Sequence, residues 1–234
     1  MRSYISGSFF GGLILILLAA CASKPAVQES GNQVAVDSTA LQSGDLLFVG
    51  LPMSYTLDPA AENEPATLET CAGDSLNVIH VAILEVCGDS VWVIDATLKH
   101  NVDRYPLDTF LADFTLPDGS LPLFYVMRLR DNHNAAQFVA NAKQFIGRPY
   151  DCQFLADNEA QFCSELVRNS YVNPDGSFIF EEYPMDFQKK DGTFPLYWQQ
   201  LFQLIGQQIP QAKSGTTPAQ MMCEPVLKPV RVGI

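Results

Sequence analysis

Histidine, tryptophan and basic residues are scarce in this sequence of 234 residues. It contains three histidines, two tryptophans, and 14 Lys and Arg against 26 Asp and Glu, which gives a net charge of −12. A surface with this balance does not suit binding to nucleic acid or direct adhesion to anionic lipid headgroups. The sequence also has no internal repeat, and its six cysteines match no zinc-binding spacing. We therefore expect neither a metal nor a cofactor, and no nucleic-acid partner.

A hydrophobic run of membrane-spanning length is missing from the N-terminus. The apolar run from Phe9 to Leu18 is too short for a comfortable transmembrane helix, and small residues follow it directly before Cys21. This pattern resembles the lipobox of bacterial lipoproteins, which implies that residues 1–20 are a signal peptide and that Cys21 is lipidated. An ordinary secretory signal is the alternative. Cleavage removes Arg2 and no acidic residue, so the net charge becomes −13 and the lipid must provide the anchor.

The remainder of the sequence suits a single globular domain, since 47% of the residues are hydrophobic and aromatic residues occur throughout. Residues 21–40 predict a flexible tether, and residues 41–234 the folded domain. From Pro52 to Asp74 the composition turns acidic, which indicates a solvated insertion or a loop that shapes a substrate entrance. Four cysteines, namely Cys71, Cys87, Cys152 and Cys223, could pair in three ways, and the sequence does not choose among them.

Hydrophobic periodicity predicts strands mainly in the first half and helices in the second, which is typical of an α+β fold. Strands are expected at 46–49, 77–86, 90–96 and 121–129, with a further strand edge and a short helix within 101–118. Helices are expected at 135–146, 163–171 and 196–205. Asn134 should cap the first of these helices and Gly147 should end it, whereas Thr217 and Pro218 should begin a short terminal helix.

The pairing of the strands at 77–86 and 90–96 decides whether His80 has a carboxylate partner. With a four-residue loop, Val86 to Asp89, His80 lies directly opposite Asp95. With a three-residue loop, Asp95 faces Val81 and points to the other side of the sheet. Turn statistics alone leave both loop lengths open.

Cys163 begins an apolar helical pattern, which places a thiol at a helix N-terminus. The unpaired N–H groups and the positive dipole end of a helix stabilise a thiolate, which is the nucleophilic form of cysteine. A thiolate nucleophile needs a base, a group that holds the base, and donors for the oxyanion. His80 and Asp95 suit the first two roles, and the Cys163 N–H with the Tyr150 hydroxyl suits the third. Taken singly, each of these residues is more often structural.

The order of the motifs resembles a known family. Gly44-Asp45-Leu46-Leu47-Phe48, a His80 strand, an Asp95 strand, Gly147-x-Pro-Tyr150-Asp151 and Phe162-Cys163-Ser164-Glu165 are similar to the circularly permuted, papain-fold branch of the NlpC-like cysteine hydrolases, the YiiX/YebB type. The resemblance implies a permuted papain-like fold with an antiparallel sheet packed against helices. Its histidine-to-acid interval favours the four-residue loop.

Carried over by position, the resemblance implies Cys163 as nucleophile, His80 as general base and acid, Asp95 as the acidic third member, and Tyr150 in the oxyanion hole or in substrate positioning. The family's usual third residue is Glu, so this chain has the shorter side chain. Glu165 also falls within the family pattern, but a helical Glu two residues after the nucleophile can equally be a structural acceptor.

The resemblance implies an envelope-anchored hydrolase acting on amides of cell-wall-type peptides or small amino-acid amides, held at the membrane through Cys21. Two alternatives remain open at this stage. Some permuted relatives, resembling lecithin:retinol acyltransferase, act on lipid acyl groups. A non-catalytic lipoprotein that binds peptide or lipid in a papain-like groove is the other. Neither the membrane face nor the oligomeric state follows from the sequence.

Overall fold

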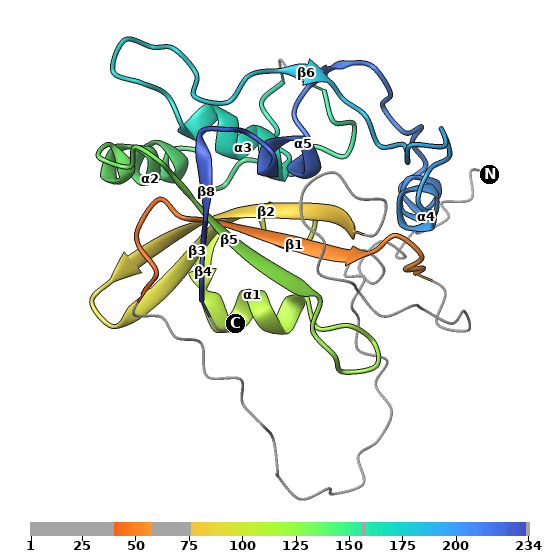
Figure 1. The fold of residues 1–234 in the computed structure, drawn as a ribbon, viewed down its shortest axis with the longest axis horizontal. Helices are drawn as coiled ribbons and strands as arrows, with labels where there is room; N and C mark the ends of the chain where they lie inside the picture. The colour runs from red at the N-terminus through yellow and green to blue at the C-terminus, as the bar shows by residue number, and fades with distance from the viewer. Residues whose placement is uncertain (1–39, 58–75, 156–157, 233–234) are drawn as a thin grey trace, which may run out of the picture.

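A central antiparallel sheet organises the molecule, as the computed structural model shows for residues 40–57, 76–155 and 158–232. Among these described residues, the sheet has six strands in the order β4-β3-β2-β1-β5-β8 (Figure 1). The strands are β1 (Leu46–Pro52), β2 (Leu76–Cys87), β3 (Ser90–Thr97), β4 (Asn101–Pro106), β5 (Leu123–Leu129) and β8 (Leu227–Val230). A separate pair joins β6 (Tyr183–Pro184) to β7 (Ser214–Gly215). The predicted α+β class with an antiparallel sheet is confirmed.

Helices cover both faces of this sheet. In Figure 1, α2 (Ala135–Lys143), α3 (Cys163–Ser170) and α5 (Pro218–Met222) lie on one face. The helix α1 (Leu107–Asp113) lies on the opposite face, and α4 (Leu196–Leu204) lies at one end of the sheet. The strand β1 is buried along nearly its whole length because Leu46 and Phe48 enter one core while Leu47 and Val49 enter the other.

An ion pair locks the start of β1 to β5. The Asp45 carboxylate is fully buried and accepts two hydrogen bonds from the Arg128 guanidinium, at 2.6 and 2.8 Å. Its second oxygen also accepts the Gln42 N–H at 2.8 Å. Gly44 precedes it with φ +80°, and a Cβ at this position would lie 2.8 Å from the Ala135 Cβ. The Gly-Asp motif thus has a structural explanation, since the glycine fits a crowded turn and the buried carboxylate is paired with Arg128.

The β2–β3 hairpin differs from both predicted registers. Its last pair is Cys87↔Ser90, so the loop contains only Gly88 and Asp89. Gly88 has φ +59°, as a type II′ turn requires at its first central position, and this tight turn lets the strand continue through Cys87. Because the paired register ends at Ile83↔Ile94, Asp95 comes level with Ala82 rather than with His80. The prediction of a directly opposite His80–Asp95 pair was therefore wrong.

Other local predictions had mixed outcomes. Thr217 caps α5, and its Oγ1 accepts the Gln220 N–H at 3.2 Å, as predicted. Asn134 makes no side-chain cap hydrogen bond because its backbone, at φ −92° and ψ 11°, is not in the extended conformation usual for a cap. The helix α2 ends at Lys143, four residues before Gly147. The strand β8 was not predicted.

The predicted segments near the N-terminus lie outside the described residues. These are the signal peptide, Cys21, the tether, and most of the acidic segment that includes Cys71. Cys87 and Cys152 are free thiols in the described part of the chain, and every pairing of the four cysteines into two bridges needs both of them bonded. No helix within residues 40–57, 76–155 and 158–232 is long and apolar enough to cross a bilayer.

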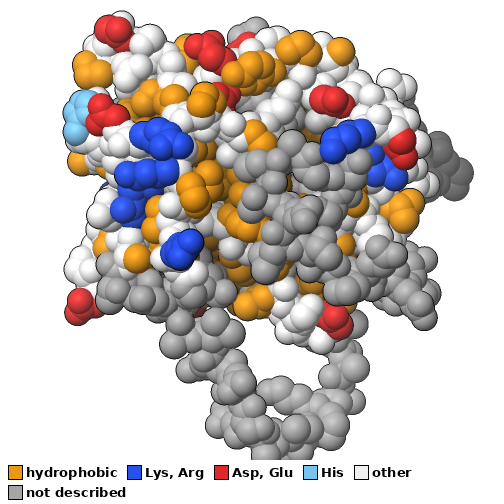
Figure 2. Space-filling view, viewed as in Figure 1, with side chains coloured by type: hydrophobic (Ala, Val, Ile, Leu, Met, Phe, Trp, Pro, Cys, Tyr) orange, Lys and Arg blue, Asp and Glu red, His pale blue; other side chains and the backbone are white. Residues whose placement is uncertain are grey.

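The surface does not reflect the acidic net charge evenly. Figure 2 shows Lys and Arg side chains on the left of this face, on the same side of the molecule as α2, and others on its right. On this part of the fold, the Glu85 carboxylate forms ion pairs with Arg104, at 2.6 Å, and with Lys143. Glu85 thus neutralises one of the two cations that it contacts.

Candidate active site

Cys163 is the first residue of α3, at the end of the helix that stabilises a thiolate. The preceding Phe162 has an extended backbone, and its N–H donates to the Glu165 carboxylate at 3.3 Å, which satisfies one N-terminal donor of the helix. The Ser164 hydroxyl donates to the Thr216 carbonyl at 3.0 Å and ties the helix start to the segment before α5. Cys163 is 4% exposed and lines a cleft, so its thiol is presented there in a nearly dry setting.

A β-bulge brings His80 into this cleft. His80 pairs with Val49 and Val78 pairs with Gly50, so Ile79 is an extra residue on β2. The bulge changes the alternation of the strand, because Val78 and Val81 enter one core and Ile79 enters the other. Bulges of this kind re-aim side chains beside active sites. The pairing of β2 with β3 ends at Ile83↔Ile94, so His80 lies beyond the hydrogen-bonded part of these two strands.

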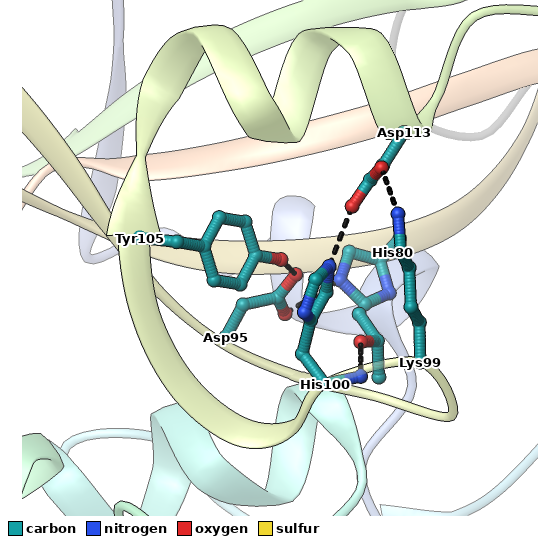
Figure 3. Close-up of polar contacts among 7 residues, drawn as sticks. His80, Asp95, Lys99, His100, Tyr105 and Asp113 are labelled. Atoms are coloured by element: carbon teal, nitrogen blue, oxygen red, sulfur yellow. Dashed lines mark hydrogen bonds and ion pairs between the residues drawn. The ribbon is translucent and has the colours of Figure 1, made fainter.

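Asp95 orients the imidazole across the gap between the two strands. The distance between His80 Nε2 and Asp95 Oδ1 is 2.7 Å, and Asp95 is fully buried (Figure 3). The carboxylate therefore reaches the ring although it is a diagonal neighbour and has the shorter side chain. This contact occupies Nε2 and leaves Nδ1 for the Cys163 sulfur.

Tyr105 holds the other carboxylate oxygen, and sequence analysis missed it. Its hydroxyl donates to Asp95 Oδ2 at 2.8 Å, and the Ala96 N–H donates to Oδ1 at 2.7 Å. Tyr105 of β4 lies opposite Val93 of β3 and therefore on the same face of the sheet as Asp95. The β3–β4 register, had it been known, would have identified Tyr105 as a partner of Asp95. Burial, followed by the charge of Asp95, raises the pKa of the Tyr105 hydroxyl far above its usual value and keeps it a donor.

The charges around His80 favour its protonated form. Burial alone would lower the pKa of the imidazole, but Asp95 and the neighbouring Cys163 sulfur together raise it to about 10. The rings of Phe110 and Phe114 pack near the imidazole, with centroids 6.1 and 5.0 Å away, and exclude water from one side. An imidazolium beside a sulfur is the arrangement of a thiolate–imidazolium pair.

Tyr150 lines the same cleft, and the turn that carries it is ordered by Asp151. Asp151 Oδ1 accepts the Gln153 N–H and Oδ2 accepts the Leu155 N–H, both at 2.7 Å, so this acid serves the turn rather than the cleft. Burial, followed by Cys163, raises the pKa of the Tyr150 hydroxyl well above its usual value. Tyr150 thus remains a neutral hydrogen-bond donor near the sulfur.

The cleft is mostly apolar inside and charged at one side. It encloses about 850 Å³ when the open space at its mouth is included. Aromatic and aliphatic side chains such as Phe154, Trp198 and Leu201 contribute to its walls, and Lys99 and Asp113 add charge. The structure therefore brings Cys163, His80 and Asp95 together, with Tyr150 on the wall of the same cleft, whereas Cys21 lies outside the described residues.

Comparisons with known proteins agree with this geometry. The family model described as "Permuted papain-like amidase enzyme, YaeF/YiiX, C92 family" matches residues 40–231. The uncharacterized protein YiiX of Escherichia coli K12 is 29% identical over 192 residues, which cover 81% of this chain and 85% of that protein. A crystal structure of YiiX from E. coli O157:H7 superposes with a TM-score of 0.54 at 23% identity and covers 81% of this chain and 96% of the other.

That crystal structure is described as one of a metalloprotein. In the part of the present chain that the structure describes, no three His, Cys, Asp or Glu side chains are grouped so that they could hold a metal ion. Because the family model spans most of the sequence and the site has the cysteine, histidine and acid of a papain-like fold, this chain belongs to the permuted papain-like amidases of the YaeF/YiiX, C92 family.

Proposed function

We propose that this protein is a cysteine amidase that hydrolyses amide bonds through a thioester on Cys163. One observation carries the proposal. The imidazole of His80 lies beside the Cys163 sulfur at a helix N-terminus, and a buried carboxylate 2.7 Å away fixes its orientation. A purely structural role would not require these three groups to meet in an open cleft.

The reaction consists of two acyl transfers. The Cys163 thiolate attacks the amide carbonyl, and the tetrahedral intermediate collapses as the C–N bond breaks and His80 gives its proton to the leaving amine. Water then attacks the thioester while His80 accepts a proton from it, and the C–S bond breaks to release the acid. Asp95 stabilises the imidazolium through its hydrogen bond to His80. Tyr105 positions Asp95 by donating a hydrogen bond to its other oxygen.

The oxyanion is assigned to two donors. The backbone N–H of Cys163 has no earlier helical carbonyl to pair with, because this residue begins α3. The Tyr150 hydroxyl stays protonated and lines the same cleft. Removing one donor of an oxyanion hole lowers kcat by about 10²–10³-fold in other enzymes, so the Tyr150→Phe variant should retain weak activity.

For the substrate, we propose amides of cell-wall-type peptides or small amino-acid amides, encountered in the bacterial envelope. The lipobox-like N-terminus supports this location, because a lipidated Cys21 would hold the domain at a membrane. The aromatic lining of the cleft supports a second candidate, the transfer or hydrolysis of lipid acyl groups. A role in binding without catalysis has less support, because binding alone gives no function to the His80–Asp95 pair.

Selective alkylation tests the thiolate–imidazolium pair. With limiting iodoacetamide, we expect Cys163 to be modified well below pH 8 and ahead of Cys87 and Cys152, as identified by mass spectrometry. The His80→Ala variant should lose this selectivity, and the Cys163→Ala variant should lose amidase activity but still bind substrate. The exposed thiol of Cys87 provides an internal reference in every sample. An inert Cys163 would refute the proposed enzyme at its first step.

A further inference from the structure

A charged cluster flanks the cleft on the side of His80. Lys99 follows β3 and Asp113 ends α1, and both line the cleft. The Lys99 ammonium donates to Asp113 Oδ1 at 2.6 Å, while His100 Nε2 lies 2.6 Å from Asp113 Oδ2 (Figure 3). The His100 N–H donates to Thr97 Oγ1 at 3.0 Å and fixes the turn that carries Lys99. The proposed amide hydrolysis uses none of these groups.

The spare hydrogen-bonding capacity of this cluster is that of a donor. Each oxygen of Asp113 already has a partner, whereas the Lys99 ammonium has three N–H groups and makes one hydrogen bond among the described residues. The Lys99 side chain is 39% exposed, so its remaining N–H groups can reach a ligand. Among the described residues that line the cleft, Lys99 is the one lysine or arginine. A ligand group that binds to Lys99 should therefore be a hydrogen-bond acceptor, and a carboxylate makes the stronger, charge-assisted bond.

The position of the cluster identifies which half of the substrate it faces. His80 protonates the leaving amine, so the amine half of an amide lies on the His80 side of the scissile bond. Lys99 shares this side, because it follows the strand that carries Asp95, and its partner Asp113 ends the helix whose Phe110 packs near the imidazole. Apolar walls that include Trp198 and Leu201 remain for the acyl half.

We propose that Lys99 binds a carboxylate on the leaving amine, so that the substrates are amides of amino acids with a free α-carboxylate and an apolar acyl group. This inference rests on the proposed amidase function and names its substrate class. The same chemistry occurs in an acylated free amino acid and in the C-terminal residue of a peptide. A protein with a net charge of −12 repels anions overall, so binding of such a substrate depends on a local cation at the cleft.

Matched substrates test the role of Lys99 with the full-length protein. N-decanoylglycine carries the carboxylate and N-decanoylglycinamide lacks it, and N-acetylphenylalanylglycine with its glycinamide forms the peptide pair. We expect kcat/KM to be at least 10-fold higher for the carboxylate member of a cleaved pair, mainly through a lower KM. Lys99→Met should abolish that preference, and Lys99→Arg should retain most of it. Lys228→Met changes an exposed lysine of β8 and is the matched control, which should retain the full preference for the carboxylate.

The outcomes separate this inference from the proposed function. Equal cleavage of both members of each pair would overturn the role of Lys99 and leave the amidase intact. If no probe is cleaved, binding of N-decanoylglycine to the Cys163→Ala variant is measured by calorimetry, where Lys99→Met should weaken it at least fivefold. Binding that ignores Lys99, or no binding, would also overturn the inference. Cleavage of one pair only would identify whether acylated amino acids or peptides are the source.

Discussion

Asp95 has a buried carboxylate whose two oxygens are both engaged, and this explains how it can replace a longer Glu. Tyr105 and His80 hold one oxygen each, at 2.8 and 2.7 Å. The contact with His80 forms although the strand register makes Asp95 a diagonal rather than a direct neighbour of His80, which lies beside the bulge at Ile79. In the proposed mechanism, Asp95 orients the imidazole and stabilises its charge.

His80→Ala should therefore lower activity more than Asp95→Ala does. General acid–base catalysis contributes about 10²–10⁴-fold, so we expect losses in this range for the histidine variant. The aspartate variant should lose less than the histidine variant, because a base without its orienting partner still transfers protons. Steady-state kcat on one amide substrate checks this, with circular dichroism as a control for folding. Equal losses would contradict the proposed division of roles.

The alkaline limb of the pH–rate profile provides an independent check. His80 donates a proton only below its pKa, which Asp95 and Cys163 raise to about 10 against the opposing effect of burial. The wild-type rate should thus fall as the pH rises through about 10. In Asp95→Asn the main raising charge is lost, burial dominates, and the limb should move to lower pH. A limb that stays in place would show that Asp95 does not set this pKa.

At the scale of the element, α3 carries a buried acid near its start. Glu165 is 7% exposed and accepts the Phe162 N–H at 3.3 Å. Burial raises its pKa to about 7, although the Phe162 hydrogen bond acts in the other direction. The ordinary value is 4.5, so the folded protein holds this proton more tightly than the unfolded chain does. The stability that it contributes is complete below about pH 4.5 and is lost as the pH rises through about 7.

Glu165→Gln should consequently stabilise the protein in alkaline solution. A glutamine can still accept the Phe162 N–H, as in a capping box, and has no charge to desolvate. We expect the free energy of unfolding to gain up to about 3 kcal/mol at pH 8.5, with little difference at pH 4.5. Urea denaturation of both proteins at the two pH values measures this. A gain that does not depend on pH would point to packing instead of ionisation.

Elements defined by local signals were predictable, and those defined by distant contacts were not. Thr217 before a proline indicated α5 correctly, since a cap uses groups within four residues. The strand β8 was missed because its Lys228 and Pro229 break the alternation and its existence depends on β5, about 100 residues earlier. The predicted β2–β3 register was wrong because Gly88 permits a shorter turn than the four-residue loop that the family resemblance favoured.

The candidate site shows the same division. The sequence predicted Cys163 and His80 because their motifs are local, and the structure brings them together with Asp95 at the end of the β2–β3 pairing. Tyr105 could be found only with the β3–β4 register, and the Lys99–Asp113 pair had no sequence signal, since these contacts arise where β4 and α1 meet β3. Side chains that act through a third element have no fixed spacing in the sequence.

At the scale of the whole molecule, the sheet is covered on both faces and the cleft opens at its end, near the start of α3. Family similarity covers residues 40–231, which include nearly all of the residues that the structure describes. We propose that the segment before them attaches the protein to a membrane. Because the protein is acidic, electrostatic repulsion from anionic headgroups would oppose attachment rather than provide it.

We therefore predict that Cys21 alone attaches the protein to a membrane. In bacteria fed a clickable fatty acid, the wild-type protein should incorporate the label and remain in the membrane fraction after a wash with 1 M salt. Cys21→Ser should lose the label completely, whereas Cys87→Ser, which changes an exposed thiol of the folded domain, should retain it. Two or three acyl chains bind stably because each buried methylene contributes about 0.8 kcal/mol, and salt does not screen this term. Release by salt, or label that persists in Cys21→Ser, would show that another part of the protein makes the attachment.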